Sequence, residues 1–170
     1  MYIDAATTVA FTGHRTYSNQ ANERLCDAVR SLYADGYRTF LSGMAVGFDM
    51  AAAECIIALR NELPDVRLVC VVPFEGQYKR FSSAERERYG RIIEQADHTL
   101  TLAERYTADV YFRRNDFLAD NSSAVIAYFS GAKGGTAYTV HRARRKSSLV
   151  LNLWDDLQQI FNFEEEDNTI

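Results

Sequence analysis

Long hydrophobic runs are absent from this sequence of 170 residues, in which no apolar stretch approaches the ~20 residues that a membrane-spanning helix needs. The N-terminal stretch MYIDAATTVAF has neither a basic start nor a long apolar segment behind it, so we expect no signal peptide. Without a membrane segment or a secretory leader, the protein is expected in the cytoplasm.

Cysteine is scarce. The three cysteines, Cys26, Cys55 and Cys70, are odd in number, and no two of them have the spacing of zinc ligands. They lie in helix-like or strand-like segments, so we expect reduced thiols in the core instead of a disulfide framework. No cluster of carboxylates requires a metal, and we expect no metal site.

Positive charge is not in excess, because the formal net charge is −4. Residues 155–170 hold six carboxylates and no lysine or arginine, which leaves 19 basic and 17 acidic residues, a net charge of +2, in residues 1–154. Double-stranded nucleic acid would need a strongly basic surface, so we do not expect nucleic acid as the partner. We expect residues 155–170 to form a short helix and an acidic tail.

Strand-like and helix-like segments alternate along the chain. The expected strands are 8–12, 39–41, 67–72, 99–102, 124–129 and 149–153, and the expected helices are 18–35, 48–63, 82–96, 110–121 and 136–146. The strands are mostly continuous apolar runs, as expected where helices cover both faces of a sheet. This order predicts an α/β fold: a single Rossmann-like, three-layer domain over residues 1–154, with a mostly parallel sheet of about six strands.

Glycine-bearing loops follow three of the expected strands. They read TGHR (12–15), SGMAVGFD (42–49) and SGAKGGT (130–136), and each precedes an expected helix. Loops after parallel strands emerge at one edge of the sheet, where ligands bind. Glycine lets the backbone approach a ligand, and the start of the next helix offers unpaired N–H groups to an anion. The usual dinucleotide and P-loop patterns are absent, so the loops alone do not name a ligand.

These loops, together with VPFEGQ (72–77) and RRNDFLADNSSAVIAYFSGAKGGT (113–136), resemble the YpsA-like family of the SLOG superfamily. That family has a Rossmann-like fold and is related to the LOG phosphoribohydrolases and to the DNA-processing protein DprA. The resemblance implies a pocket for a nucleotide or a nucleotide-derived ligand, such as an ADP-ribose-like or phosphoribosyl compound. It implies no particular reaction.

The expected ligand-binding residues all lie in or beside these loops. They are Gly13, His14, Arg15, Ser42, Gly43, Met44, Gly47, Asp49, Pro73, Glu75, Gln77, Arg114, Asn115, Ser130, Gly131, Lys133, Gly134, Gly135 and Thr136. The planar guanidinium of Arg15 suits a phosphate, and residues 133–136 combine a lysine with the amides of a helix start. Each feature also has an ordinary structural alternative as a turn, a cap or a solvated loop.

Carboxylates provide the two candidates for catalysis. Asp49, near the start of a helix, repels phosphate and therefore suits ribose hydroxyls or a stabilising role at the helix dipole. Glu75 is the best placed acid or base in a loop, with plain solvation as the alternative. Thr139 stands where the LOG enzymes carry a catalytic glutamate.

The sequence thus predicts a binding protein or sensor for a nucleotide-derived small molecule. Two alternatives stay open: a hydrolase of N-glycosidic or phosphate bonds, and a DprA-like single-stranded DNA binder that uses the basic run 142–146. Tyr17, Tyr78 and Tyr106 are candidates for stacking on a base. A homo-oligomer is also open.

Overall fold

Six strands form a single sheet in residues 1–154, the part of the chain that this computed structural model describes. The strand order is β4-β3-β2-β1-β5-β6, and every neighbouring pair is parallel. The prediction of a six-stranded Rossmann-like sheet is therefore confirmed. The expected short helix and acidic tail at 155–170 lie outside the described residues.

Helices and strands alternate strictly in residues 1–154, apart from two short 3-10 turns. The strands are β1 (Thr8–Gly13), β2 (Thr39–Ser42), β3 (Arg67–Val72), β4 (His98–Thr101), β5 (Ala124–Tyr128) and β6 (Leu149–Asn152). The helices are α1 (Asn22–Ala34), α2 (Phe48–Leu59), α3 (Ser83–Gln95), α4 (Val110–Asp120) and α5 (Gly135–Arg145), and the 3-10 turns are η1 (Ala5–Thr7) and η2 (Gln77–Arg80). None of the helices in this part of the chain has both the length and the apolar character needed to cross a membrane.

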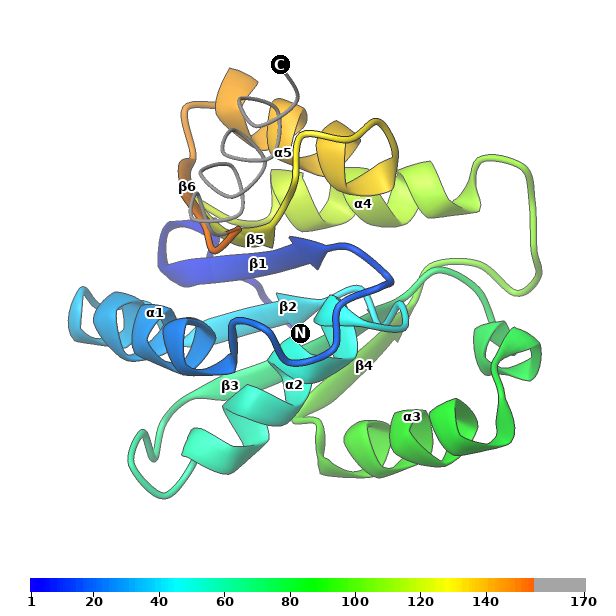
Figure 1. Cartoon of the computed structure of the whole chain (residues 1–170), viewed down its shortest axis with the longest axis horizontal. Helices are drawn as coiled ribbons and strands as arrows, with labels where there is room; N and C mark the ends of the chain where they lie inside the picture. The colour runs from blue at the N-terminus through cyan, green and yellow to red at the C-terminus, as the bar shows by residue number, and fades with distance from the viewer. Residues whose placement is uncertain (155–170) are drawn as a thin grey trace, which may run out of the picture.

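Side chains that alternate along the strands divide the core into two layers. In the central strand β1, Val9 and Phe11 pack with residues of α1, α2 and α3. Ala10, between them, packs instead with residues of α4 and α5. Figure 1 shows the same division, with α4 and α5 on one face of the sheet and the other three helices on the opposite face. Because both faces are covered, the strands are apolar at consecutive positions.

Two helix boundaries differ by four residues from the sequence-based expectation, for local reasons. Helix α1 begins at Asn22, four residues later than expected, because Asn19 has a φ of +68°, which no right-handed helix includes. Helix α2 ends at Leu59, four residues earlier than expected. The N–H groups of Glu62 and Leu63 both donate to the Leu59 carbonyl, at 3.0 and 2.8 Å, and this tight turn closes the helix.

The start of α3 follows the sequence pattern. The Ser82 hydroxyl accepts a hydrogen bond from the N–H of Glu85 at 3.3 Å, and the Glu85 carboxylate accepts one from the N–H of Ser82 at 3.0 Å. This reciprocal pair is the capping box that the sequence predicts.

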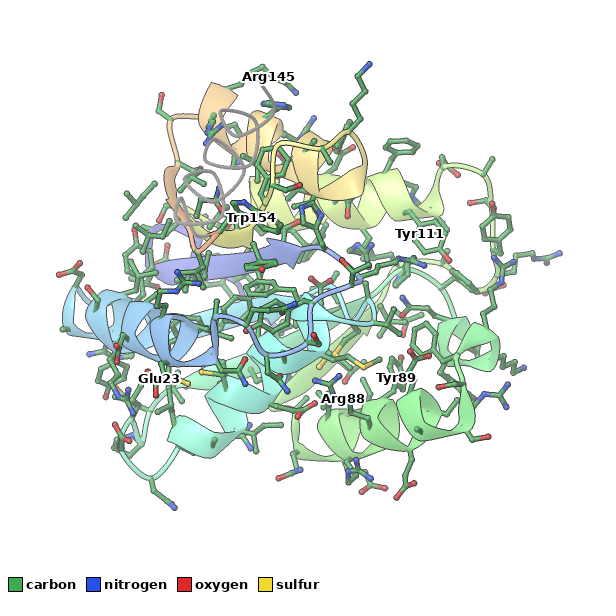
Figure 2. All side chains as sticks on the ribbon, viewed as in Figure 1. Glu23, Arg88, Tyr89, Tyr111, Arg145 and Trp154 are labelled. Carbon is green, nitrogen blue, oxygen red and sulfur yellow. The ribbon has the colours of Figure 1, made fainter. Side chains whose placement is uncertain are left out.

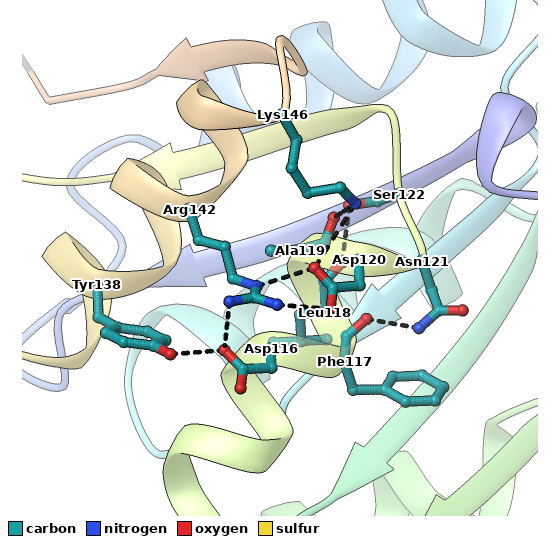
Figure 3. Close-up of polar contacts among 10 residues, drawn as sticks. All are labelled: Asp116, Phe117, Leu118, Ala119, Asp120, Asn121, Ser122, Tyr138, Arg142 and Lys146. Atoms are coloured by element: carbon teal, nitrogen blue, oxygen red, sulfur yellow. Dashed lines mark hydrogen bonds and ion pairs between the residues drawn. The ribbon is translucent and has the colours of Figure 1, made fainter.

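Polar contacts between partly exposed side chains join α4 to α5, as Figure 3 shows. Arg142 donates two hydrogen bonds of 2.8 Å to the Asp120 carboxylate and lies 3.4 Å from Asp116, which also accepts a 2.6 Å bond from Tyr138. The Arg142 guanidinium holds the pKa of Asp120 below its usual value. Lys146 donates to the Ala119 carbonyl at 2.9 Å. Two of the basic residues in 142–146 are thus engaged within the fold.

Gly13, at the end of β1, lies against a core aromatic ring. A Cβ atom there would be 2.4 Å from Cγ of Phe48, which is fully buried. Because such overpacking forces the core to shift, Gly13→Ala is expected to lower the free energy of unfolding by about 1–3 kcal/mol. Urea denaturation measures this change.

Gly90 provides the matched control, because it lies inside α3 and a Cβ atom there would meet nothing within 4 Å. Gly90→Ala is expected to be neutral or to stabilise the protein by up to about 1 kcal/mol. Equal stabilities of the two variants would contradict the close contact between Gly13 and Phe48.

Candidate functional site

The strand order reverses at β1, and a crevice opens there. From β1 the chain builds β2, β3 and β4 on one side, and then returns to place β5 on the other side of β1. The loops after β1 and β5 therefore lead into helices on opposite faces of the sheet, which leaves space between them. A cavity of about 600 Å³ lies at this place, a volume typical of small-molecule sites.

The cavity brings together residues from four segments of the chain. Its predicted members are Gly13, His14, Arg15, Asp49, Arg114, Asn115, Lys133, Gly134, Gly135 and Thr136. Thr12, Ala45, Tyr111, Phe112, Leu118, Ala132 and Tyr138 line it as well. The structure thus gathers about half of the expected ligand-binding residues in one cavity.

The loop between β5 and α5 forms the side of the cavity best suited to an anion. Gly131 and Gly134 have φ values of +93° and +146°, which residues with a side chain rarely adopt. Helix α5 then begins at Gly135, and no side chain caps it. The first N–H groups of the helix are therefore offered at the cavity, where Lys133 and Thr136 also lie.

A pair of buried charged residues lies on the side of the cavity opposite the loop between β5 and α5. Arg114 of α4 and Asp49 of α2 are 6% and 5% exposed, and both pack against Gly43. Arg114 donates one hydrogen bond to the Gly43 carbonyl and one of 2.8 Å to the Asn115 side chain. Asp49 accepts a bond of 3.3 Å from the N–H of Ala45. A Cβ atom on Gly43 would meet both charged side chains at 2.8–3.0 Å, so only glycine fits there.

Burial shifts the ionisation of both partners. It raises the pKa of Asp49 from 3.8 to about 6, although the charges of Arg114 and Arg15 and the Ala45 N–H oppose this change. Burial also lowers the pKa of Arg114, while Asp49 opposes that shift. Arg114 keeps its positive charge at neutral pH because its ordinary pKa is far above 7.

Three cationic side chains, those of Arg15, Arg114 and Lys133, thus line the cavity beside one carboxyl group, that of Asp49. The balance of charge is positive. Taken with the free helix start of α5, it favours a negatively charged ligand.

His14 connects the two sides of the crevice. Its Nε2 atom accepts a hydrogen bond of 2.8 Å from the N–H of Ser130, in the loop after β5. The ring must be deprotonated at Nε2 to accept this bond, and burial lowers the pKa of His14. The backbone carbonyl of His14 also accepts a bond from the N–H of Phe48 at 3.2 Å. His14 therefore holds both loops in place as well as lining the cavity.

The predicted residues of the loop after β2 support the cavity from below. Ser42 is fully buried; its hydroxyl donates to the Asp49 carbonyl at 2.8 Å and accepts from the N–H of Met44 at 3.3 Å. Met44 is also buried and has a φ of +57°. Gly47 has a φ of +85°, and a Cβ atom there would be 2.4 Å from the carbonyl oxygen of Arg15. Ser42, Met44 and Gly47 thus fix Asp49 and Arg15 without lining the cavity themselves.

The other predicted residues also lie outside the cavity lining. Pro73 is buried, and Glu75 is exposed, with its N–H bonded to the Ala103 carbonyl at 3.0 Å. Gln77 is 2% exposed, and its Oε1 atom accepts no hydrogen bond from the described residues. Gly131 is exposed in the loop before α5. In residues 1–154 no three His, Cys, Asp or Glu side chains converge as a metal site.

Sequence reasoning missed the aromatic side of the cavity, which consists of Tyr111, Phe112 and Tyr138. Figure 2 shows Tyr111 on α4, near the carboxyl edge of the sheet. The sequence did contain a pattern that could have identified Tyr111. Positions 111, 114, 115 and 118 have the i, i+3, i+4, i+7 spacing of one helical face, and Arg114 and Asn115 were already candidates.

Two of the tyrosines considered for base stacking have other surroundings. Tyr17 is 6% exposed, and its hydroxyl donates to Asn22 at 2.6 Å and accepts from the N–H of Ala21 at 3.1 Å. The stacking prediction for Tyr17 is therefore wrong, since this ring belongs to the core. Tyr78 packs on Tyr89, with ring centroids 5.6 Å apart, and does not line the cavity.

A doubly wound parallel sheet with a cationic crevice at its switch point defines the class of Rossmann-like α/β ligand-binding domains. Within that class, the family model YpsA, described as the YspA SLOG family, matches residues 9–152. The chain therefore belongs to this family, and the resemblance carried by its glycine-bearing loops is confirmed.

Relatives of similar length support the assignment. The SPbeta prophage-derived protein YoqJ of Bacillus subtilis is 29% identical over 137 residues, which are 74% of this chain and 79% of YoqJ. A UPF0398 protein of Bacillus cereus is 30% identical over 142 residues, which are 79% of this chain and 77% of that protein.

Solved structures with the same fold include two DprA proteins. DprA from Streptococcus pneumoniae has a TM-score of 0.63 and 23% identity over 84% of this chain, which spans only 48% of that protein. DprA from Helicobacter pylori has a TM-score of 0.63 and 19% identity, covering 95% of this chain and 74% of the other. The latter is described by its single-stranded DNA binding mode. These neighbours contradict the expectation that nucleic acid is not a partner, which rested on net charge alone.

The neutral ring of His14 predicts a pH dependence. Because the pKa of His14 in the folded protein lies below its ordinary value of 6.5, the unfolded chain binds the additional proton as the pH falls. The contribution of His14 to stability is thus fully present above about pH 7 and decreases as the pH falls below 6.5. Glutamine at this position offers an acceptor oxygen to the N–H of Ser130 without titrating, so His14→Gln is expected to flatten the decline between pH 7 and pH 5.

Measurement of the unfolding free energy against pH in both proteins tests this. Asp49 has the opposite effect, since its raised pKa makes its stabilising contribution decrease as the pH rises from 3.8 to about 6. Asp49 is common to both proteins, so its effect cancels in the difference between them. Parallel pH profiles would contradict the assignment of a neutral His14.

Proposed function

We propose that this protein binds a nucleotide or a nucleotide-derived ligand that carries phosphate, in the crevice between β1 and β5, and acts as a sensor or regulator. The observation that carries the proposal is the meeting of an uncapped helix start with the cationic residues Arg15, Arg114 and Lys133 in a single cavity. Such a combination suits a phosphate group, whose oxygens share up to two negative charges.

The phosphate is assigned to the side formed by Lys133 and the residues that open α5. Backbone N–H groups at a helix start bind anions through direct hydrogen bonds and through the helix dipole. The glycines of this loop leave the backbone open to close approach, since a Cβ atom at Gly134 would meet nothing within 4 Å. Arg15 lies on the facing loop and closes the same space with a second positive charge.

The rest of the ligand is assigned to the aromatic side of the cavity and to Asp49. Tyr111, Phe112 and Tyr138 offer flat apolar surfaces, and Phe112 packs against Tyr138 with ring centroids 5.2 Å apart. Flat rings of this kind suit a nucleobase. Asp49, whose carboxyl group lines the cavity, can exchange hydrogen bonds with ribose hydroxyls.

Binding is better supported than bond cleavage by these residues. Glu75, the first candidate for acid–base chemistry, is exposed and outside the cavity lining. Thr139, at the position of the LOG glutamate, is fully buried and donates its hydroxyl hydrogen to the Gly135 carbonyl at 3.0 Å. Asp49 is the remaining carboxyl group, and it is held in the buried pair with Arg114.

A thermal-shift screen tests the proposed function. Purified protein is combined with AMP, ADP, ADP-ribose, ribose 5-phosphate and inorganic phosphate. A ligand present at 100 times its dissociation constant stabilises the fold by about 2.7 kcal/mol, which raises the Tm of a domain of this size by about 5–10 °C. Arg15→Ala is expected to weaken binding by about 10–100-fold, because a charge-assisted hydrogen bond is lost.

Arg144→Ala is the matched control, since Arg144 is an exposed arginine in the last turn of α5, outside the cavity lining. It is expected to keep the full shift. A flat response to every phosphate compound, or an equal loss in both arginine variants, would count against the proposal.

Single-stranded nucleic acid is a second candidate, favoured by the DprA neighbours and by aromatic side chains at the mouth of the site. Phe112 and Tyr106 are 52% and 46% exposed, and the guanidinium of Arg80 lies 4.5 Å from the centre of the Tyr106 ring. Exposed rings beside cations can stack on bases that are not paired, while the anion site holds a backbone phosphate.

Fluorescence anisotropy with a labelled oligothymidine tests this candidate. Binding is expected at low salt, with affinity that falls steeply as salt rises. Phe112→Ala is expected to cost about 1–3 kcal/mol of binding free energy, the usual contribution of one stacked base. Tyr2→Ala, which removes another exposed ring outside the cavity lining, serves as the control. No binding at low salt would dismiss this candidate and leave the small-ligand proposal standing.

A further inference from the structure

Two of the three cysteines meet between neighbouring helices. Cys26 lies in the second turn of α1, and Cys55 lies in α2, 29 positions further along the sequence. Their sulfur atoms are 2.8 Å apart, and both thiols are free. Cys70 lies in β3 and is fully buried. The sequence led us to expect reduced core thiols, and the structure adds that two of them, Cys26 and Cys55, lie in contact.

One member of this pair can be reached from solvent. Cys26 is partly exposed and lines a surface hollow with Asn22, Glu23, Asp27 and Arg30. Cys55 is 6% exposed and lies behind it. Burial is the main cause that raises the pKa of Cys55 far above its usual value, and the contact with Cys26 adds to it. A reagent in solution therefore meets Cys26 first, and Cys55 is the group waiting next to it.

We propose that Cys26 and Cys55 form a reversible disulfide site, with Cys26 as the thiol that reacts with a peroxide and Cys55 as the thiol that resolves the product. In the first step the Cys26 sulfur attacks one peroxide oxygen, the O–O bond breaks, and hydrogen peroxide leaves one water and a sulfenic acid. In the second step the Cys55 sulfur attacks the Cys26 sulfur, the S–O bond breaks, and a second water leaves with the proton of Cys55. Two thiols are oxidised and one peroxide is reduced to two waters.

The disulfide would connect the two helices that follow two of the cavity loops. Helix α1 follows the loop that contains His14 and Arg15, and α2 begins with the turn that contains Asp49. A bond between them links residues that are distant in the sequence and so restricts the unfolded chain. Neither cysteine lines the cavity, so the disulfide site is separate from the proposed ligand site.

Peptide mapping of the full chain tests the proposal. The reduced protein is treated with a small excess of hydrogen peroxide, the remaining thiols are alkylated under denaturing conditions, and the tryptic peptides are identified by mass. The expected product joins the peptide 25–30 to the peptide 39–60, with two hydrogens lost, while Cys70 in peptide 68–79 is alkylated. The oxidised protein is expected to melt about 5–10 °C higher than the reduced one, and dithiothreitol is expected to reverse both changes.

Three controls make the test specific. Cys26→Ser is expected to abolish the linked peptide, whereas Cys70→Ser is expected to keep it. Oxidation in urea should favour the shorter 55–70 loop, because only the fold brings Cys26 to Cys55. The proposal is overturned if Cys26 proceeds to sulfinic acid without the link, if it links two chains instead, or if a stoichiometric peroxide treatment leaves both thiols free.

Discussion

The hydrogen bond from the Arg114 guanidinium to the Gly43 carbonyl is the contact on which the site depends. It joins α4, on one face of the sheet, to the turn after β2, which leads to the opposite face. A buried guanidinium is tolerated only when it is paired and hydrogen-bonded, and Asp49 and Asn115 complete its surroundings. Because a Cβ atom at Gly43 would collide with Arg114 and Asp49, the glycine of this loop serves packing, and the ligand side of the cavity lies elsewhere.

Around this contact the fold keeps a polar crevice open inside an apolar structure. Both faces of the central strands are covered, so side chains at consecutive positions of these strands are buried. The strand ends are different, because at the switch point the chain departs to opposite faces and leaves the cavity between the two loops. The imidazole of His14 spans it through Ser130, and the contacts of Arg142 with Asp120 keep α5 against α4. The uncapped start of α5 is thus held near the loop after β1.

The fold was largely predictable, whereas the site was predictable only by its loops. Apolar runs that alternate with amphipathic segments identified all six strands, and errors occurred at helix ends, where Asn19 and the turn after Leu59 decide locally. Glycine loops indicated the correct sheet edge. They did not reveal that Gly43 and Gly47 face the interior while Gly134 faces the cavity, because glycine permits both uses. Net charge was too coarse to exclude nucleic acid as a partner, since binding depends on where charges gather and not on their sum.

The sequence by itself determined the fold class, the parallel arrangement of the strands and the family. Hydrophobic periodicity and loop composition are local properties, so they can be recognised directly in the amino-acid sequence. Only the tertiary structure decided which polar residues meet. It buried Arg114 with Asp49, turned the ring of His14 into a hydrogen-bond acceptor, and placed Cys26 beside Cys55. Each of these depends on contact between residues far apart in the chain. The spacing of these residues in the sequence does not indicate that they are in contact. Only the packing of the helices on a shared sheet brings the residues together.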